Sequence, residues 1–203
     1  KDINHFYISM INTAGIDFGN SNCVVAAPKE TGVEVVLNQS SNRLNPTMVT
    51  FGDERRYAGE LSSQQQLQYP TGTITDLRKL LNLQYDSPER ETLSKYMPNL
   101  VPLEDGTVGI KVNYRDNEII LRPEQCIALL LKNLSSIAGM EDYVITVAPW
   151  WSERQRRAML NACKIADIKC SCLLNTTTAA AIAYILQHRT RLPKPNEKSV
   201  NVA

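Results

Sequence analysis

Short apolar runs separated by turn residues characterise the first quarter of the chain. Strands are predicted at residues 14–18, 23–27 and 33–37, because each run is rich in apolar and β-branched residues. Residues 28–32 carry the Pro and Gly of a hairpin loop. The pattern predicts a β-meander that ends near Pro46, because the residue before a proline is restricted to extended backbone.

The middle of the chain mixes helical and strand periods. Apolar residues recur at helical spacing between Ile74 and Leu81, which predicts a helix over 74–81. The other elements predicted here are a Gln-rich helix at 60–68 and strands at 48–51, 56–57, 100–103, 108–113 and 118–121. We therefore expect a small α+β insertion over residues 47–121.

Helices and strands alternate beyond residue 121. One helix opens at Pro123, in a first-turn position, and Ser152 caps another with Gln155 three residues later. The β-branched run at 143–147 is typical of a strand buried on both faces. The remaining elements are a strand at 169–174 and an Ala-rich helix at 178–187 that can pack against a sheet. This order predicts a βαβα unit.

The candidate chemistry lies in the run Gly15-Ile16-Asp17-Phe18-Gly19-Asn20-Ser21-Asn22. Two glycines allow a backbone course that a side chain would block, so the amides after Gly19 can converge on a phosphate. A carboxylate facing polyphosphate would be repelled unless a cation stood between them. Asp17 is therefore interpreted as reaching Mg²⁺ through its water shell. The alternative is a hairpin turn with a solvated Asp.

This run, followed by Cys23-Val24-Val25, resembles the first phosphate loop of the actin-like ATPases and specifically of the heat-shock 70 superfamily. Further matches follow in order at 45–49, 142–147 and 178–184. The pair Asn20 and Asn22 and the segment at 148–156 resemble the heat-shock 110 branch most. The resemblance covers nearly the whole chain from about residue 14.

The resemblance implies an α/β fold, one actin-like ATPase (ribonuclease H-like) lobe with a smaller α+β insertion subdomain. Residues 10–46 and 122–203 would form subdomain IA, and residues 47–121 the inserted subdomain IB. Residues 1–9 are interpreted as a leader, with Met10 as the natural start. The superfamily's second phosphate loop comes later in the chain, so we expect a fragment that is itself inactive.

The resemblance assigns phosphate binding to Gly19, Asn20, Ser21 and Asn22, and places Asp17 in the Mg²⁺ shell. The ligands implied for the complete domain are ATP and ADP with Mg²⁺.

Three positions depart from the heat-shock 70 pattern. Arg78 stands where the family carries a catalytic lysine, and a planar guanidinium cannot occupy a point-charge site unchanged. Without the resemblance, Arg78 reads as a solvated residue on an exposed helix face. Thr176 replaces the glutamate of Asn-Glu-Pro-Thr, and Asn20 replaces a threonine beside the phosphates. The departures predict phosphate binding with impaired hydrolysis.

A proline and a downstream arginine relay nucleotide state to the substrate domain in heat-shock 70 proteins. The matching positions are Ala148 and Arg156, with Pro149 one place on. A strand stop before a helix explains Pro149 equally well. Trp150 and Trp151 are expected in the core, with an exposed contact surface as the alternative.

The composition narrows the classes of function. In 203 residues, 22 basic and 21 acidic side chains leave a net charge of +1, which gives no argument for nucleic acid or a membrane surface. No apolar run approaches the roughly 20 residues of a membrane span. Five cysteines in mostly apolar segments predict reduced thiols and a cytoplasmic setting. Metal binding at 170–172 is disfavoured, because one residue separates the cysteines and no histidine is near.

The resemblance implies a chaperone that binds ATP, acts as a nucleotide exchange factor for heat-shock 70 partners and binds unfolded clients, with little hydrolysis of its own. One alternative is an active heat-shock 70 chaperone ATPase, including a ribosome-associated divergent member. Another is a small-molecule kinase on the same scaffold, but the sequence offers no acid or His constellation to position a phosphoryl acceptor.

Overall fold

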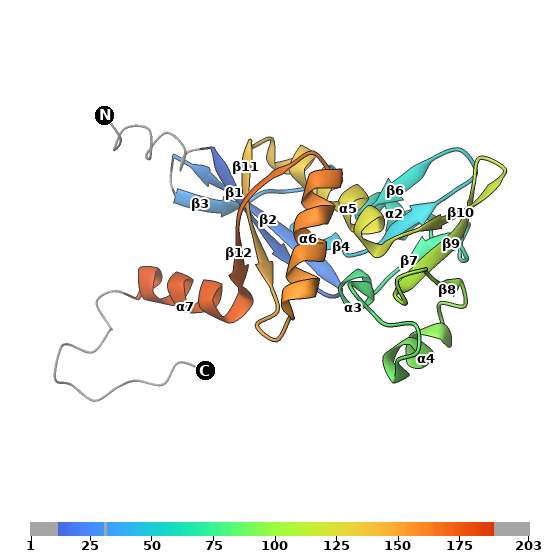
Figure 1. Cartoon of the computed structure of the whole chain (residues 1–203). Helices are drawn as coiled ribbons and strands as arrows, with labels where there is room; N and C mark the ends of the chain where they lie inside the picture. Colours follow the sequence, from blue (N-terminus) through green and yellow to red (C-terminus); the bar gives the residue numbers. More distant parts are fainter. Residues whose placement is uncertain (1–11, 31, 189–203) are drawn as a thin grey trace.

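The computed structural model describes residues 12–30 and 32–188, so the predicted leader and Met10 lie outside the described residues. A six-stranded sheet forms the centre, in the order β12-β11-β1-β2-β3 with β4 paired to β2 (Figure 1). Its strands are β1 (Thr13–Phe18), β2 (Asn22–Lys29), β3 (Gly32–Val35), β4 (Asn45–Pro46), β11 (Asp142–Val147) and β12 (Lys169–Asn175). Strands β1, β11 and β12 are parallel, whereas β2 and β3 are antiparallel to their neighbours. The predicted meander is confirmed, but Lys29 pairs with Gly32, so the hairpin loop is shorter than 28–32.

Helices α5 (Pro123–Ala138) and α6 (Glu153–Ile165) contact each other and pack on the central sheet. The predicted capping box of α6 is present, because Ser152 Oγ accepts from the Gln155 amide while the Gln155 side chain accepts from the Ser152 amide. Burial within β11 is greatest at alternate positions, with Val144 and Thr146 only half-buried. The prediction of a strand buried on both faces is therefore correct for one face only.

Helix α7 (Thr176–Gln187) projects from the end of β12, away from α5 and α6 (Figure 1). It contacts β11 and β12 but none of its residues is buried. Ile182, Ile185 and Leu186 are each about half exposed. The expectation that this helix packs tightly against the sheet is wrong within the described chain.

Residues 47–121 form two three-stranded antiparallel sheets and three short helices. One sheet holds β5 (Val49–Phe51), β6 (Arg56–Ala58) and β7 (Thr73–Ile74), and the other β8 (Leu100–Pro102), β9 (Val108–Tyr114) and β10 (Asn117–Leu121). The helices are α2 (Glu60–Gln65), α3 (Leu77–Leu80) and α4 (Pro88–Ser94).

The predicted helix at 74–81 is wrong in its first half. Ile74 belongs to β7, and Asp76 adopts a left-handed backbone (φ 49°) that separates this strand from α3. Ile74, Leu77 and Leu80 are nevertheless all fully buried. The apolar spacing thus predicted correctly which residues are buried, but not the type of element that holds Ile74. Helix α4 was not predicted, although Ser87 and Pro88 supply its cap and first turn.

One core cluster runs through both the central sheet and residues 47–121. Helix α5 joins the two parts, because it contacts β2 and α6 on one side and α3, β5, β6 and β9 on the other. Its Leu130, Leu131 and Leu134 are fully buried. The division into subdomains IA and IB remains our proposal, with α5 as their shared element.

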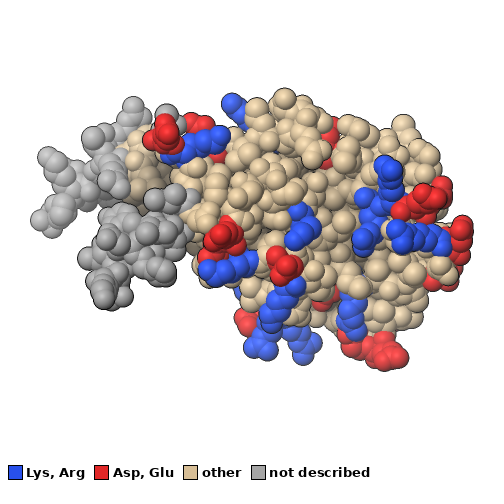
Figure 2. Space-filling model, turned by 90° about the horizontal axis from the view of Figure 1, so that it is seen from above, with Lys and Arg blue, Asp and Glu red and all other residues tan. Residues whose placement is uncertain are grey.

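Charges of both signs are interspersed on the face seen in Figure 2. Across the described residues, no helix combines the length and apolar character needed to cross a membrane.

Candidate functional site

The carboxyl ends of β1, β11 and β12 meet at one edge of the central sheet, because the three strands are parallel and adjacent. The turn at 19–22 follows β1, Ala148 and Pro149 follow β11, and Thr176 follows β12. Ligands of open α/β sheets bind outside the carboxyl ends of the strands. The fold thus brings three segments that are distant in the sequence to one candidate site.

Asp17 is exposed at this edge and is oriented by the neighbouring strand. Thr146 Oγ1 donates to Asp17 Oδ1 at 2.5 Å and accepts from the Phe18 amide at 3.3 Å. The described residues contain no cluster of three or more metal-ligating side chains. A single fixed carboxylate suits Mg²⁺, which keeps several waters and takes few protein ligands. Asp17 therefore fits the predicted role.

Gly19 is required by close backbone packing. A Cβ atom at Gly19 would lie 2.1 Å from the carbonyl oxygen of Asn22, so no side chain fits without a shift of the turn. A Cβ at Gly15 would meet nothing closer than Ala26 O at 4.0 Å. The interpretation that both glycines allow a blocked backbone course is confirmed for Gly19 and wrong for Gly15.

Thr47, whose role sequence reasoning did not predict, holds the turn through two hydrogen bonds to its backbone. Its amide donates to Ser21 O at 2.9 Å and its hydroxyl donates to Gly19 O at 3.0 Å. A trans peptide points its N–H opposite to its carbonyl. The N–H groups of Asn20 and Asn22 therefore point away from Thr47. This is the orientation that phosphate binding by the turn requires.

Cys23 lies directly beneath the turn and contacts Thr47 Oγ1 at 3.2 Å. Its burial raises the pKa of the thiol to about 11. The thiol therefore stays protonated at neutral pH and acts as a packing group.

Asn20 connects the turn to the inserted region. Its Nδ2 donates to Asp76 Oδ1 at 3.2 Å, and Asp76 also accepts from Lys79 at 2.6 Å and Tyr96 at 3.1 Å. Burial disfavours ionisation of Asp76, but the hydrogen bonds from Lys79, Asn20 and Tyr96 outweigh it and lower its pKa. Asn20 is therefore held by an ionised partner. Sequence reasoning did not predict a role for Asp76 and instead selected Arg78, two positions further on.

Arg78 is half-buried, with its guanidinium carbon 5.7 Å from the centroid of the Trp151 ring. This cation–π contact replaces the freely solvated state that the sequence alone favours. Trp151 is buried at 7% exposure, as expected for core, but Trp150 is 80% exposed, and the core expectation is wrong for it. A hollow of about 990 Å³ beside the turn is lined by both tryptophans, Asn20 and Arg78.

Arg156 joins the ends of β11 and β12. Its Nη2 donates to Asn175 Oδ1 at 2.7 Å and to Ala148 O at 3.4 Å. Thr176 Oγ1 donates to Val147 O at 3.0 Å, so its hydroxyl is engaged with the backbone. Pro149 is exposed beside this junction. The signalling roles of Pro149 and Arg156 stay predictions.

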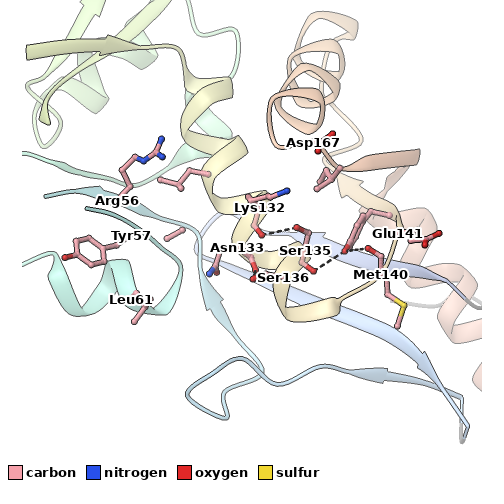
Figure 3. A pocket seen from close by; sticks show the side chains of 14 residues that line it. Arg56, Tyr57, Leu61, Lys132, Asn133, Ser135, Ser136, Met140, Glu141 and Asp167 are labelled. Carbon is pink, nitrogen blue, oxygen red and sulfur yellow. Dashed lines mark hydrogen bonds between the residues drawn. The ribbon is translucent and has the colours of Figure 1, made fainter. Parts of the chain in front are cut away.

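A second hollow, of about 650 Å³, lies away from these residues (Figure 3). Arg56, Tyr57 and Leu61 line one side, and Lys132 and Asn133 of α5 line the other. None of the predicted site residues contributes to its lining. The sequence-predicted site residues therefore lie outside this hollow.

The sequence of this chain is similar to the sequences of known proteins. The family model described as Hsp70 protein matches residues 13–203. The chain is 34% identical over 196 residues to a heat shock protein homolog of Candida glabrata, an alignment that covers 93% of the chain. It is 33% identical over 197 residues to heat shock 70 kDa protein 14 of Arabidopsis thaliana, which covers 94%. The chain belongs to the Hsp70 family, which confirms the predicted actin-like ATPase lobe.

Within that family, its similarity is to Hsp110-like members, as predicted. Heat shock protein 88 of Dictyostelium discoideum is a third such relative, 34% identical over 177 residues that cover 84% of the chain. The chain spans 28%, 24% and 23% of the lengths of these three relatives. It corresponds to part of an Hsp70-family nucleotide-binding domain.

Proposed function

We propose that the complete protein binds ATP and ADP with Mg²⁺ and acts as a nucleotide exchange factor for Hsp70 chaperones, with little hydrolysis. The observation that carries the proposal is a contrast at one edge of the sheet. The turn at 19–22 keeps a geometry suited to phosphate, whereas Arg78 and Thr176 are engaged elsewhere, on Trp151 and on Val147 O.

In this proposal the N–H groups of Asn20 and Asn22 donate to phosphate oxygens, and Gly19 lets the backbone approach closely. Asp17, fixed by Thr146, contacts the water shell of Mg²⁺. Mg²⁺ would neutralise phosphate charge when bound. Asn20 also transmits the position of the turn to Asp76, and so to α3.

Weak hydrolysis follows from the groups at the two replaced positions. Positioned charges that stabilise the transition state supply most of the rate of phosphoryl transfer. The guanidinium of Arg78 is attracted to the Trp151 ring, and a threonine hydroxyl at 176 carries no charge to orient water. Binding without turnover suits a protein that uses nucleotide to hold one conformation.

The exchange-factor role also draws on the similarity to Hsp110-like relatives. We propose an Hsp70 chaperone and unfolded proteins as partners, and the cytoplasm as the compartment. Among the described cysteines, Cys23, Cys126 and Cys163 are free and buried, as suits a reducing compartment.

The test measures ATP and ADP affinity of the full-length protein with and without Mg²⁺, together with its effect on ADP release from an Hsp70 protein. Asp17→Asn should weaken only the Mg²⁺-dependent affinity, by about tenfold for a loss of about 1.4 kcal/mol. Glu118→Gln, on β10 and paired with Lys111, is the matched control and should change nothing. A protein that ignores adenine nucleotides would refute the proposal.

Single-turnover hydrolysis separates the alternatives. A rate equal to that of an ordinary Hsp70 ATPase would favour the active-chaperone alternative. The double variant Arg78→Lys, Thr176→Glu should raise the rate above wild type while ADP affinity stays within about threefold, a difference of under about 1 kcal/mol. Thermal stabilisation by a sugar would instead revive the kinase alternative.

A further inference from the structure

Asp76 lies where the turn at 19–22 meets the inserted region. One carboxylate oxygen, Oδ1, accepts from Asn20 Nδ2 at 3.2 Å and from Lys79 Nζ at 2.6 Å. The other oxygen, Oδ2, accepts from the Tyr96 hydroxyl at 3.1 Å. Asn20 belongs to the turn, Lys79 lies in α3, and Tyr96 follows α4. One carboxylate thus holds three segments of the chain together.

The backbone of Asp76 is in the left-handed region, with φ 49° and ψ 31°. Gly, Asn and Asp are the residues that adopt this conformation most readily. The side chain of Asp76 is 17% exposed, and its charge is balanced by the ammonium group of Lys79. The carboxylate can therefore stand beside the turn without repelling a phosphate from it.

The Asn20 side chain could also bond within the turn itself. Asparagine oxygens accept hydrogen bonds from the backbone N–H two residues further on, which forms an Asx turn. For Asn20 this N–H is the amide of Asn22, which our proposed function assigns to phosphate. In the part of the chain that the structure describes, the hydrogen bond of the Asn20 side chain goes to Asp76. Without Asp76, the oxygen of Asn20 would compete with phosphate for the Asn22 amide.

We propose that Asp76 is a positioning residue for nucleotide binding, which holds the Asn20 side chain away from the Asn22 amide and so leaves this N–H open to a phosphate oxygen. Asp76 acts only through Asn20. Lys79 and Tyr96 act one step further back, because they orient the carboxylate that binds Asn20. The inference rests on the proposed function, because it concerns phosphate binding by the same turn.

This arrangement makes nucleotide affinity depend on the inserted region. Asn20, Lys79 and Tyr96 all line the hollow of about 990 Å³ beside the turn. The Tyr96 amide donates to Leu93 O at 3.1 Å, which ties Tyr96 to the end of α4. A movement of α4 that withdraws the Tyr96 hydroxyl would loosen the carboxylate, and with it the Asn20 side chain. The inserted region would then weaken nucleotide binding without touching the nucleotide.

The test measures ADP affinity of the full-length protein with Mg²⁺ for variants at position 76, alone and combined with Asn20→Ala. Asp76→Gly removes the carboxylate where the backbone suits glycine, and should weaken ADP binding by about tenfold, because one hydrogen bond now competes with phosphate. Asp76→Asn keeps the left-handed backbone and one acceptor oxygen, and should lose only about threefold. In the Asn20→Ala background neither substitution should change the affinity by more than about twofold, because no side chain is left to cover the Asn22 amide.

Tyr96→Phe is a second probe that keeps the ring of a residue that is 53% exposed, so the fold is not at risk. It should weaken ADP binding by about two- to threefold, and again only when the Asn20 side chain is present. Asp105→Asn is the matched control, because Asp105 also forms an ion pair in the inserted region, with Arg122 at 2.7 Å. It should leave ADP affinity unchanged.

A loss of affinity that is equal with and without the Asn20 side chain would overturn the inference, because Asp76 would then serve only the fold. Undiminished ADP binding by both Asp76→Gly and Tyr96→Phe would overturn it as well. Both results would leave the proposed function in place. A wild-type protein that does not bind ADP would instead refute the proposed function, and this inference with it.

Discussion

The turn at 19–22 and the end of β12 lie on the same edge of the sheet but are held in different ways. The turn rests on buried groups, because Thr47 is 3% exposed, Cys23 is fully buried, and Gly19 is in close contact with Asn22. The end of β12 is solvent-accessible and is held by hydrogen bonds at Asn175 and Thr176. The turn itself is largely exposed but rests directly on buried residues, while the end of β12 is held by hydrogen bonds that solvent can reach.

Because of this difference, substitutions at the end of β12 should cost less stability than substitutions in the turn. A substitution in the turn must change its packing and the geometry of ligand binding together, because the same backbone atoms take part in both. A substitution at the end of β12 removes only a solvent-accessible hydrogen bond, which contributes about 0.5–1.5 kcal/mol. The Hsp70-type glutamate could therefore be lost at position 176 without loss of the fold.

Gly19→Ala should have the largest effect. Its methyl group would lie 2.1 Å from Asn22 O, and the turn must move to admit it. We expect a loss of about 3 kcal/mol in the free energy of unfolding, measured with urea. Gly15→Ala is the matched control, because its nearest neighbour is 4.0 Å away, and it should cost less than about 1 kcal/mol. Equal losses for the two variants would contradict the comparison.

Thr47→Val should come next. The two side chains have the same shape, but valine removes the hydrogen bond to the part-buried Gly19 O. An unsatisfied buried acceptor costs about 1–3 kcal/mol. Thr47→Ser keeps the hydroxyl and should lose less, which urea unfolding of both variants would measure. A valine variant as stable as the serine variant would mean that Thr47 serves only as packing.

Much of the fold was predictable because hydrophobic period and caps are local signals. The capping box at Ser152 and the strand at 143–147 are correct within one or two residues. The prediction of a helix at 74–81 was wrong because Asp76 adopts a left-handed backbone. In this conformation its carboxylate accepts bonds from Asn20, Lys79 and Tyr96. Two of these partners are distant in the sequence, so no local pattern could indicate them.

The candidate site was predictable where the backbone itself is the signal, as at Gly19. Its supports were not, because Thr47 reaches Gly19 across 28 positions of the sequence and Thr146 reaches Asp17 across 129. A polar residue at 146 within an apolar strand was an available signal for the latter. The stacking of Arg78 on Trp151 had no local signal, because nothing in either segment indicates the other.

Asp142 provides a pH test at the opposite end of β11 and β12. Burial would raise its pKa, but bonds from Lys169 (2.7 Å), Ser171 and the Tyr143 amide outweigh burial and lower it. A carboxyl with a lowered folded pKa stabilises the fold above its unfolded pKa of about 4 and loses this contribution as pH falls through the folded value. Between pH 6 and pH 3, the free energy of unfolding of wild type should therefore fall by more than that of Asp142→Asn. The difference between the two should be smaller than the loss caused by Thr47→Val. Parallel pH curves would exclude this contribution.

Asn175→Ala should have the smallest effect on stability. It removes the acceptor for Arg156 Nη2, but the arginine keeps its bonds to Trp151 O and Ala148 O. Asn175 makes no side-chain cap for α7, so no capping energy is lost with it. We expect a loss of about 0.5–1 kcal/mol in urea unfolding, because the bond is accessible to water. Thr176→Val should be similar. A loss as large as that of Thr47→Val would mean that the end of β12 is as firmly built into the core as the turn.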